Sequence, residues 1–157
     1  MTLGWILWFA TLLPQPAADS LCLGTTVYLE ARDQSPRGQQ AVAEVALRRQ
    51  ESGLWGHSLC EVVTARKQFA PGIVSPRVRL NNPVAWERSM QVAVRARRNW
   101  ALPPDMREEV VPGASHFLAH NLASPAWRNA PEVAVIDDHT FLRVQNLKPR
   151  RDASSEA

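Results

Sequence analysis

The sequence predicts a single α+β domain that is mainly helical. Apolar residues recur at helical spacing through the first two thirds of the chain. Short extended candidates occur only after the Pro103-Pro104 pair. The length of 157 residues and the apolar content of 45% are sufficient for one domain with a hydrophobic core.

Two helices are expected early in this domain. Residues 21–31 keep apolar side chains on one face. A second helix should begin at Pro36, because Ser35 is a suitable N-cap and proline suits the first helical position. It should end near Gly53, and the arginine pair 48–49 in its last turns suits the helix dipole.

Later segments complete the prediction. Ser58 and Glu61 have the spacing of a capping box, which opens a short helix, and Asn82-Pro83 opens a longer one. Residues 67–72 between them are expected to form a loop. The extended candidates are residues 114–118 and 133–144, the second broken by Asp137-Asp138.

The N-terminal 18 residues have the character of a targeting segment. Residues 3–13 are almost continuously apolar, too short to span a bilayer comfortably, and followed by Pro14. We therefore expect a signal or signal-anchor segment over 1–18 that makes few contacts with the domain, with Ala17-Ala18 as the candidate cleavage point and cleavage itself left open. The alternative is an apolar helix docked on the domain. The domain itself should cover 19–147, followed by a polar tail over 148–157.

Charge and cysteine content narrow the class further. The net charge of +3 is modest, unlike the dense Lys/Arg of a nucleic-acid binder, and suits an anionic polymer such as bacterial cell wall. Tryptophan is abundant, and indole faces stack well on sugar rings. Cys22 and Cys60 either form a disulfide in an oxidising compartment or remain two buried thiols.

Glu30 is the candidate for acid–base chemistry. It ends an apolar, helical run, Val27-Tyr28-Leu29-Glu30. Apolar surroundings disfavour the charged form of a carboxyl group and raise its pKa. A glutamic acid with a raised pKa is the proton donor that cleavage of a glycosidic bond requires. The alternative is a solvated glutamate at a helix end.

A set of short segments, at matching intervals, resembles the cell-wall hydrolase family typified by the spore-cortex-lytic enzymes. The resemblance runs from about Leu21 to Arg143. The segments that carry it are Leu21-Cys22-Leu23, Tyr28-Leu29-Glu30-Ala31-Arg32, Gly38-Gln39-Gln40-Ala41-Val42-Ala43, Cys60-Glu61-Val62-Val63, Lys67-Gln68-Phe69, Ser115-His116-Phe117, Pro125-Ala126-Trp127 and His139-Thr140-Phe141.

This resemblance implies a lysozyme-like catalytic domain, related in architecture to goose-type lysozymes and lytic transglycosylases. It implies cleavage of the β-1,4 bond between N-acetylmuramic acid and N-acetylglucosamine, with Glu30 as acid and base and Cys22 bonded to Cys60. The chain departs from many relatives in having Leu29 for Gly or His, Gln34 for a second acid, Arg48 for Asn, Ala70 for Ser and Leu142 for an aromatic residue.

Further residues are expected around the sugar. Gln68 is a candidate to bind an acetamido group, and Phe69 either walls the cleft or packs in the core. His116 is expected to orient a partner by hydrogen bonding, with a buried structural histidine as the alternative, and Phe117 belongs to the same segment. Trp127 is either a cleft floor or a core residue. The histidines lack ligand spacing, so no metal and no cofactor are expected.

The chemistry has three alternatives. A lytic transglycosylase needs Glu30 alone, because the muramic C6 hydroxyl supplies the nucleophile. A hydrolytic muramidase would need a second acid such as Asp33, Glu44 or Asp137. A protein of another class would bind peptidoglycan with little catalysis. The expected partner is the peptidoglycan glycan strand, with no nucleic acid and with transient membrane association through residues 1–18. The chain is expected to be a monomer, exported to the periplasm or cell wall, or encoded by a phage.

Overall fold

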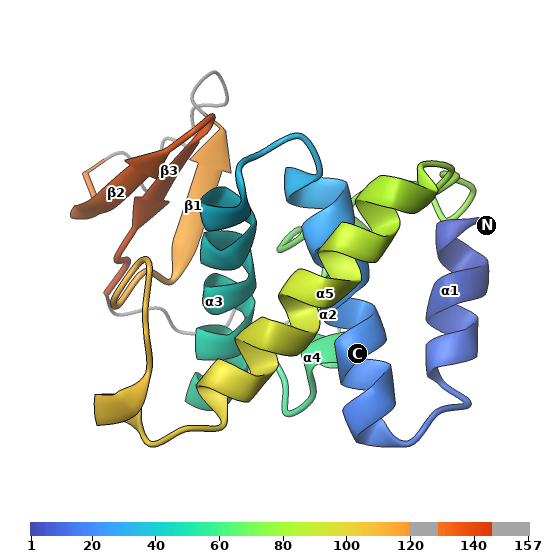
Figure 1. Cartoon of the computed structure of the whole chain (residues 1–157), viewed down its shortest axis with the longest axis horizontal. Coiled ribbons are helices and arrows are strands. Elements are labelled where there is room, and N and C mark those ends of the chain that lie inside the picture. The colour runs from blue at the N-terminus through green and yellow to red at the C-terminus, as the bar shows by residue number, and fades with distance from the viewer. Residues whose placement is uncertain (120–128, 146–157) are drawn as a thin grey trace, which may run out of the picture.

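The computed structural model describes residues 1–119 and 129–145. Its fold is α+β with helices predominant, as the sequence predicts (Figure 1). The helices are α1 (Leu3–Ala10), α2 (Gln15–Ala31), α3 (Pro36–Ser52), α4 (Leu59–Thr64) and α5 (Pro83–Trp100), with the 3₁₀ turns η1 (Ala70–Gly72) and η2 (Pro104–Met106). The strands are β1 (His116–Ala119), β2 (Glu132–Ile136) and β3 (His139–Leu142).

The helix starts follow the capping signals in the sequence. The Ser35 hydroxyl accepts from Gly38 N at the start of α3, and Asn82 caps α5 in the same way. Ser58 and Glu61 form the predicted capping box of α4. Gly53 ends α3 in the left-handed conformation, with φ of 70°, which glycine adopts without strain. α2 differs from the prediction, because it begins at Gln15 rather than near residue 21.

The late extended segments form one antiparallel sheet of order β1-β3-β2. Asp137-Asp138 does not merely interrupt the second segment; it makes the turn of the β2–β3 hairpin, with Asp137 at φ of 50°. Strand β1 pairs with β3, so that His116 lies opposite Leu142. The sheet stands beside α3 at one end of the molecule (Figure 1).

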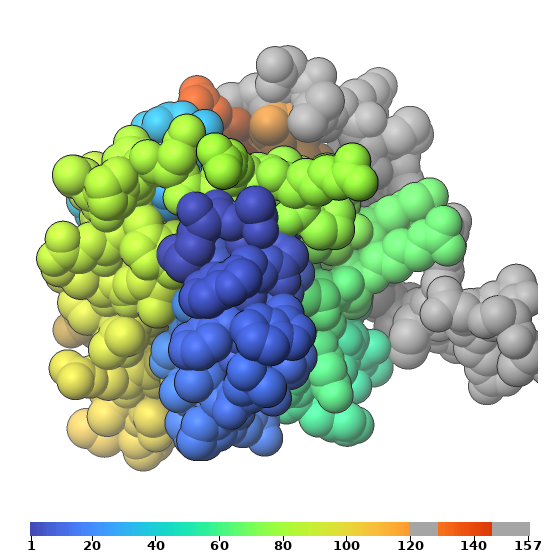
Figure 2. Space-filling model, turned by 90° about the vertical axis from the view of Figure 1, so that its right-hand side faces the viewer, coloured from blue at the N-terminus to red at the C-terminus, as the bar shows by residue number. Residues whose placement is uncertain are grey.

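The helix α1 corrects an expectation. We expected residues 3–13 to make few contacts with the domain, and this is wrong. Leu3 and Ile6 are fully buried against Tyr28 and Leu80. Backbone bonds also join α1 to the 76–80 segment, including Leu3 N to Val78 O and Leu80 N to Met1 O, both 2.8 Å. Figure 2 shows α1 lying on this face between α5 and the segment that follows α4.

The packing of α1 on the domain could not be predicted from the sequence, because almost every residue of α1 is apolar. The buried stripe Leu3, Ile6 and Ala10 has helical spacing, but the exposed face is apolar as well, so no one-sided pattern is visible. The expected cleavage point, Ala17-Ala18, falls within α2. Over the described part of the chain, no helix has the length and apolar character needed to cross a bilayer.

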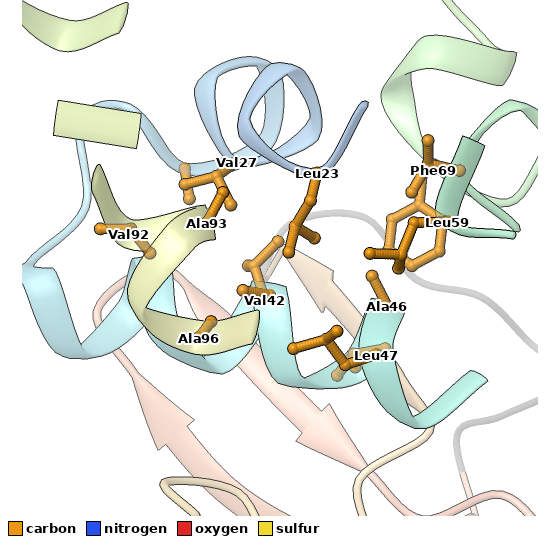
Figure 3. Packing of buried hydrophobic residues seen from close by; sticks show 14 of the residues in the cluster. Leu23, Val27, Val42, Ala46, Leu47, Leu59, Phe69, Val92, Ala93 and Ala96 are labelled. Carbon is orange, nitrogen blue, oxygen red and sulfur yellow. The ribbon is translucent and has the colours of Figure 1, made fainter. Parts of the chain in front are cut away.

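The main core lies where α2, α3 and α5 meet. Leu23 and Val27 of α2 point toward Val42 of α3 and Ala93 of α5, and all four side chains are at most 1% exposed (Figure 3). The small alanines on α3 and α5 let these helices approach closely. Each fully buried Leu or Val contributes about 1.5–3 kcal/mol by removal from water. This core fixes the positions of α2 and α3, which carry the candidate site.

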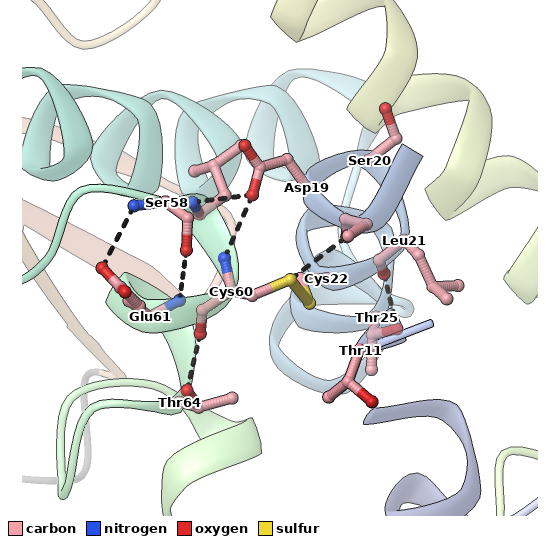
Figure 4. The surroundings of a disulfide bond; sticks show 12 residues. Thr11, Asp19, Ser20, Leu21, Cys22, Thr25, Ser58, Cys60, Glu61 and Thr64 are labelled. Carbon is pink, nitrogen blue, oxygen red and sulfur yellow. Dashed lines mark hydrogen bonds between the residues drawn. A yellow bond between two sulfur atoms is a disulfide. The ribbon is translucent and has the colours of Figure 1, made fainter. Parts of the chain in front are cut away.

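A disulfide joins α2 to α4, which confirms the Cys22–Cys60 pairing. The two Cα atoms are 5.2 Å apart. Asp19, one turn before Cys22, accepts from Leu59 N at 2.9 Å, so a carboxylate at the start of α4 holds the same junction (Figure 4). The bond therefore fixes the start of α4 and, through it, the loop that follows.

Candidate active site

Glu30 lies in the last turn of α2, where its side chain leaves the core face and reaches the loop after α4. Its Oε1 accepts a hydrogen bond from Ala70 N at 2.6 Å. The carboxyl is partly buried, and desolvation raises its pKa above the ordinary value of 4.5. The Ala70 hydrogen bond and the charge of Arg49 oppose this rise without cancelling it. Glu30 therefore retains its proton to higher pH than a solvated glutamate.

The donor to Glu30 is positioned by a tightly folded loop. Lys67 takes a left-handed conformation, with φ of 61°, and Phe69 next to Ala70 is fully buried. Gly72 closes the turn against α4, where an added Cβ would lie 2.4 Å from the Ala65 carbonyl oxygen. Only glycine fits this approach. The Phe69 side chain fixes the loop before Ala70, and Gly72 fixes it afterwards. Together they hold Ala70 N at hydrogen-bonding distance from Glu30.

Arg49 of α3 is the cation of the site, and the sequence reasoning missed it. The side chain is only 3% exposed. Its Nε donates to Ser115 O at 2.8 Å, and its Nη1 donates to Gln68 Oε1 at 3.0 Å. Burial lowers the pKa of Arg49 to about 10, while the charge of Glu30 opposes that shift. The guanidinium thus ties β1 and the 67–70 loop to α3.

A signal for Arg49 was present in the sequence. We assigned the arginine pair 48–49 to the helix dipole. Val42, Val45 and Ala46 mark the core face of α3, and Arg49 continues that face by one turn. Arg48 points elsewhere, to Glu109 Oε1 at 2.6 Å. An arginine on a core face must be compensated by fixed partners, so its position indicated a buried polar network.

Two of the residues predicted to bind substrate, Gln68 and Phe69, contact Arg49. Gln68 is bonded to its guanidinium, and the Phe69 ring centroid lies 4.8 Å from its Cζ. Phe69 belongs to the core, and the half-buried Phe117 packs against it, with the two ring centroids 5.9 Å apart. These aromatic rings pack on the core side of the 67–70 loop. Trp127 lies outside the described residues.

His116 occupies a buried position in β1, with 2% of its surface exposed. Burial, with a smaller contribution from Arg49, lowers the pKa of His116 to about 3, so the ring is neutral at physiological pH. Its Nδ1 lies 2.9 Å from Ser115 Oγ, and its ring meets the Trp55 ring edge-on at 6.0 Å. His116 is therefore a neutral, buried ring at the start of β1, in contact with Ser115 and Trp55.

The other acids considered as catalytic partners are held elsewhere. Glu44 is buried and accepts from Val110 N and Val111 N, at 2.6 and 2.9 Å. Asp137 accepts from Ser35 N and Oγ at the start of α3. Asp33 is exposed beside Arg32, at 3.8 Å. Each of these carboxylates is therefore held by a structural partner. Burial raises the pKa of Glu44 as well, but Glu44 is 1% exposed and closed off from solvent, whereas Glu30 is half-buried.

Gln34, where many relatives have a second acid, also has a structural role here. Its amide accepts from Asp138 N at 3.0 Å and donates to Asp138 Oδ2 at 3.1 Å. These bonds fasten the β2–β3 turn to the end of α2. The position therefore connects the sheet to the helices instead of adding a carboxylate.

A pocket of about 350 Å³ opens beside Arg49. It lies between the end of α3 and the start of β1, and it combines cationic, hydroxyl and indole groups. Its lining residues are Arg48, Arg49, Ser52, Leu54, Trp55, Ser115 and Val144. Across residues 1–119 and 129–145, no cluster of three or more His, Cys, Asp or Glu side chains is placed to hold a metal ion.

The fold and site define a small α+β domain in which a half-buried carboxylic acid, Glu30, is held by a backbone N–H close to a buried arginine. The family model described as Cell Wall Hydrolase matches residues 33–142, more than half of the chain. The chain belongs to the cell wall hydrolase family, and so is an enzyme that acts on the cell wall. The match begins three residues after Glu30. No curated protein and no solved structure gives a significant match.

Proposed function

We propose that the chain degrades peptidoglycan as a lytic transglycosylase, cutting the β-1,4 bond between N-acetylmuramic acid and N-acetylglucosamine. The observation that carries this proposal is the contrast between Glu30 and the other acids. Burial raises the pKa of both Glu30 and Glu44. Glu44, however, is 1% exposed and both its oxygens accept from backbone N–H groups, and Asp137 accepts from Ser35 at the start of α3. Glu30 is half-buried, so its carboxyl is accessible to a substrate. Membership of the cell wall hydrolase family supports the substrate. The lysozyme-like character of the scaffold is part of the same proposal.

In the proposed reaction Glu30 acts twice. Its carboxyl donates a proton to the glycosidic oxygen as the bond from C1 of the muramic residue breaks. The resulting carboxylate then takes the proton of the C6 hydroxyl on the same sugar, and that oxygen forms a bond to C1. The products are one strand with a free 4-hydroxyl and one with a 1,6-anhydro ring. Glu30 ends protonated, and no water is consumed.

The residues around Glu30 have distinct roles in this proposal. Arg49 stabilises the carboxylate that exists between the two proton transfers, since its charge favours the ionised form. Gln68 accepts from Arg49 through Oε1. Its amide N–H groups are thereby turned to donate, as recognition of an acetamido carbonyl requires. The pocket beside Arg49 provides an indole and a hydroxyl for the adjoining sugar.

A hydrolytic muramidase is the second candidate, and the family description favours it. In that mechanism water replaces the C6 hydroxyl and the sugar ends in a reducing group. A second carboxylate normally activates the water or stabilises the sugar cation. Asp33, Glu44 and Asp137 each bind a structural partner in the fold, which argues against the hydrolytic mechanism.

Mass spectrometry of fragments released from purified peptidoglycan distinguishes these candidates. A transglycosylase releases anhydromuramyl ends, lighter by one water than the reducing ends left by a muramidase. Exclusively reducing ends would overturn the transglycosylase proposal while retaining Glu30 as the acid. Absence of any release by folded protein, with sedimentation on cell wall retained, would favour a binding protein instead.

A further inference from the structure

An apolar aromatic patch covers the outward face of α1. Trp5, Trp8 and Phe9 are 49%, 56% and 37% exposed, and Leu12 just beyond the helix is 61% exposed. The Trp5 and Phe9 rings stack at 5.4 Å with an interplanar angle of 7°. Large side chains of this kind, gathered on one helix, mark an interaction surface rather than scattered surface apolarity.

The patch is displayed by a helix that is fixed to the domain. The opposite face of α1 is buried through Leu3 and Ile6, and the backbone of its first turn is bonded to residues 76 and 78. Trp5 and Trp8 consequently project into solvent, and α1 runs down the middle of the face that Figure 2 shows. The face is therefore built into the fold and independent of the proposed function.

Positive charge flanks this face at both ends. No residue from 1 to 18 carries a charged side chain. Exposed Arg77 and Arg79 lie beside the first turn of α1, where Thr2 pairs with Arg79. At the other end Arg97 donates to Pro16 O in the first turn of α2, the helix that follows α1. The surface thus consists of an uncharged aromatic centre with arginines at its rim.

We propose that this face of α1 is a docking surface for an anionic lipid bilayer. Indole rings favour the region of the lipid headgroups, and arginines favour anionic ones. The helix lies on the bilayer and does not cross it, because eight residues span about 12 Å, against about 30 Å of hydrocarbon.

Other occupants match the surface less well. A sugar would need hydrogen-bonding side chains beside the rings, but the one hydroxyl of the second turn, Thr11 Oγ1, donates to Trp8 O. A second copy of the chain would bring the Arg77 and Arg79 rims of two molecules together, which like-charge repulsion opposes. An anionic bilayer matches both the aromatic centre and the positively charged rim.

Co-sedimentation of the full chain with vesicles tests the proposal. The probes are vesicles of phosphatidylglycerol mixed with phosphatidylcholine, and vesicles of phosphatidylcholine alone. We expect binding to the anionic vesicles that weakens with added salt. The double variant Trp5→Ser/Trp8→Ser should lower the partition coefficient at least about tenfold, since two large apolar side chains no longer enter the interface. Arg77→Gln/Arg79→Gln should remove the preference for anionic vesicles.

Met106→Ser is the matched control. Met106 is 63% exposed but lies in η2 (gold in Figure 1), at the opposite end of the molecule from α1. The Met106→Ser variant should bind anionic vesicles as strongly as the wild type does. The proposal is overturned if the wild type does not sediment with anionic vesicles at low salt, or if the Trp5/Trp8 variant binds equally well. It is also overturned, in favour of a second copy, if the wild type forms dimers that the variant lacks and binds no vesicle.

Discussion

Glu30 combines two requirements that oppose each other at the scale of a single residue. Catalysis by a general acid needs a carboxyl that keeps its proton near neutral pH, and burial supplies this. Burial also makes the ionised form costly in the folded protein. The contribution of Glu30 to the free energy of unfolding therefore falls as pH rises above 4.5, the ordinary pKa from which it is raised.

Replacing Glu30 by Gln tests both requirements. Gln keeps an oxygen that accepts from Ala70 N but has no transferable proton, so release of wall fragments should fall about 10²–10⁴-fold. The same variant should unfold at higher urea than the wild type above pH 4.5 and lose that advantage below it. The exposed neighbour Asp33→Asn is the control for both measurements. Near-normal activity in folded Glu30→Gln would contradict the assignment of the acid.

Arg49 sets how far the pKa of Glu30 rises. Its positive charge favours the ionised carboxylate, so Arg49→Met should raise the pKa of Glu30 further and move the alkaline limb of kcat/KM to higher pH. The lost bonds to Ser115 and Gln68 should lower stability by about 1–3 kcal/mol. Arg48→Met, whose charge pairs with Glu109, is the matched control. An unchanged pH profile in folded Arg49→Met would restrict Arg49 to a structural role.

His116 should make the fold sensitive to acid. Its pKa of about 3 in the folded chain lies below the ordinary 6.5, so the unfolded chain binds an extra proton between these values. Stability should fall by roughly 3–5 kcal/mol as pH drops from 6.5 to 3. Urea unfolding at several pH values should show that His116→Asn removes much of this loss, whereas the exposed His57→Asn does not. Equal acid sensitivity in all three proteins would contradict the prediction.

At the scale of the elements, prediction succeeded where the signal is local. Ser35 and the Ser58–Glu61 pair act on amides within one turn, so they identify helix starts from the sequence alone. The hairpin turn at Asp137 and the shared environment of Arg49 and Gln68 depend on contacts between distant segments. The apolar residues before Glu30 predicted that the pKa of its carboxyl is raised. They could not show that the hydrogen-bond donor to this carboxyl is the backbone N–H of Ala70.

The helix α1 provides an element-scale test of this difference. Ile6→Ala should lower the free energy of unfolding by about 2–5 kcal/mol, because Ile6 is 1% exposed and its loss leaves a cavity beside Tyr28. The adjacent Trp5→Ala should change it little, since Trp5 projects into solvent. Chemical denaturation of both variants decides the matter. Equal stability would restore the view that α1 is a segment independent of the domain.

At the scale of the whole molecule, the site depends on how three parts are joined: the apolar cluster of Leu3, Ile6, Tyr28 and Leu80 beneath α1, the main core, and the sheet. Helix α2 belongs to both apolar clusters, carrying Tyr28 in one and Val27 in the other, and its last turn carries Glu30. The loop that supplies Ala70 N comes from α4, which is bonded to α2 through Cys22 and Cys60. The disulfide therefore closes a ring of chain, residues 22–60, that contains Glu30.

Breaking that ring should affect stability more than chemistry. The disulfide joins residues 38 apart in sequence, and the chain-entropy account assigns a loop of this size about 3–4 kcal/mol. The variant Cys22→Ala/Cys60→Ala should melt at a clearly lower temperature. Below its melting range, wall cleavage should remain within a few-fold of the wild type, because Asp19 still accepts from Leu59 N and Phe69 still anchors the loop. Paired thermal melts and cleavage assays with and without reductant measure both effects. Loss of cleavage in a fully folded variant would show that the bond itself positions Ala70 against Glu30.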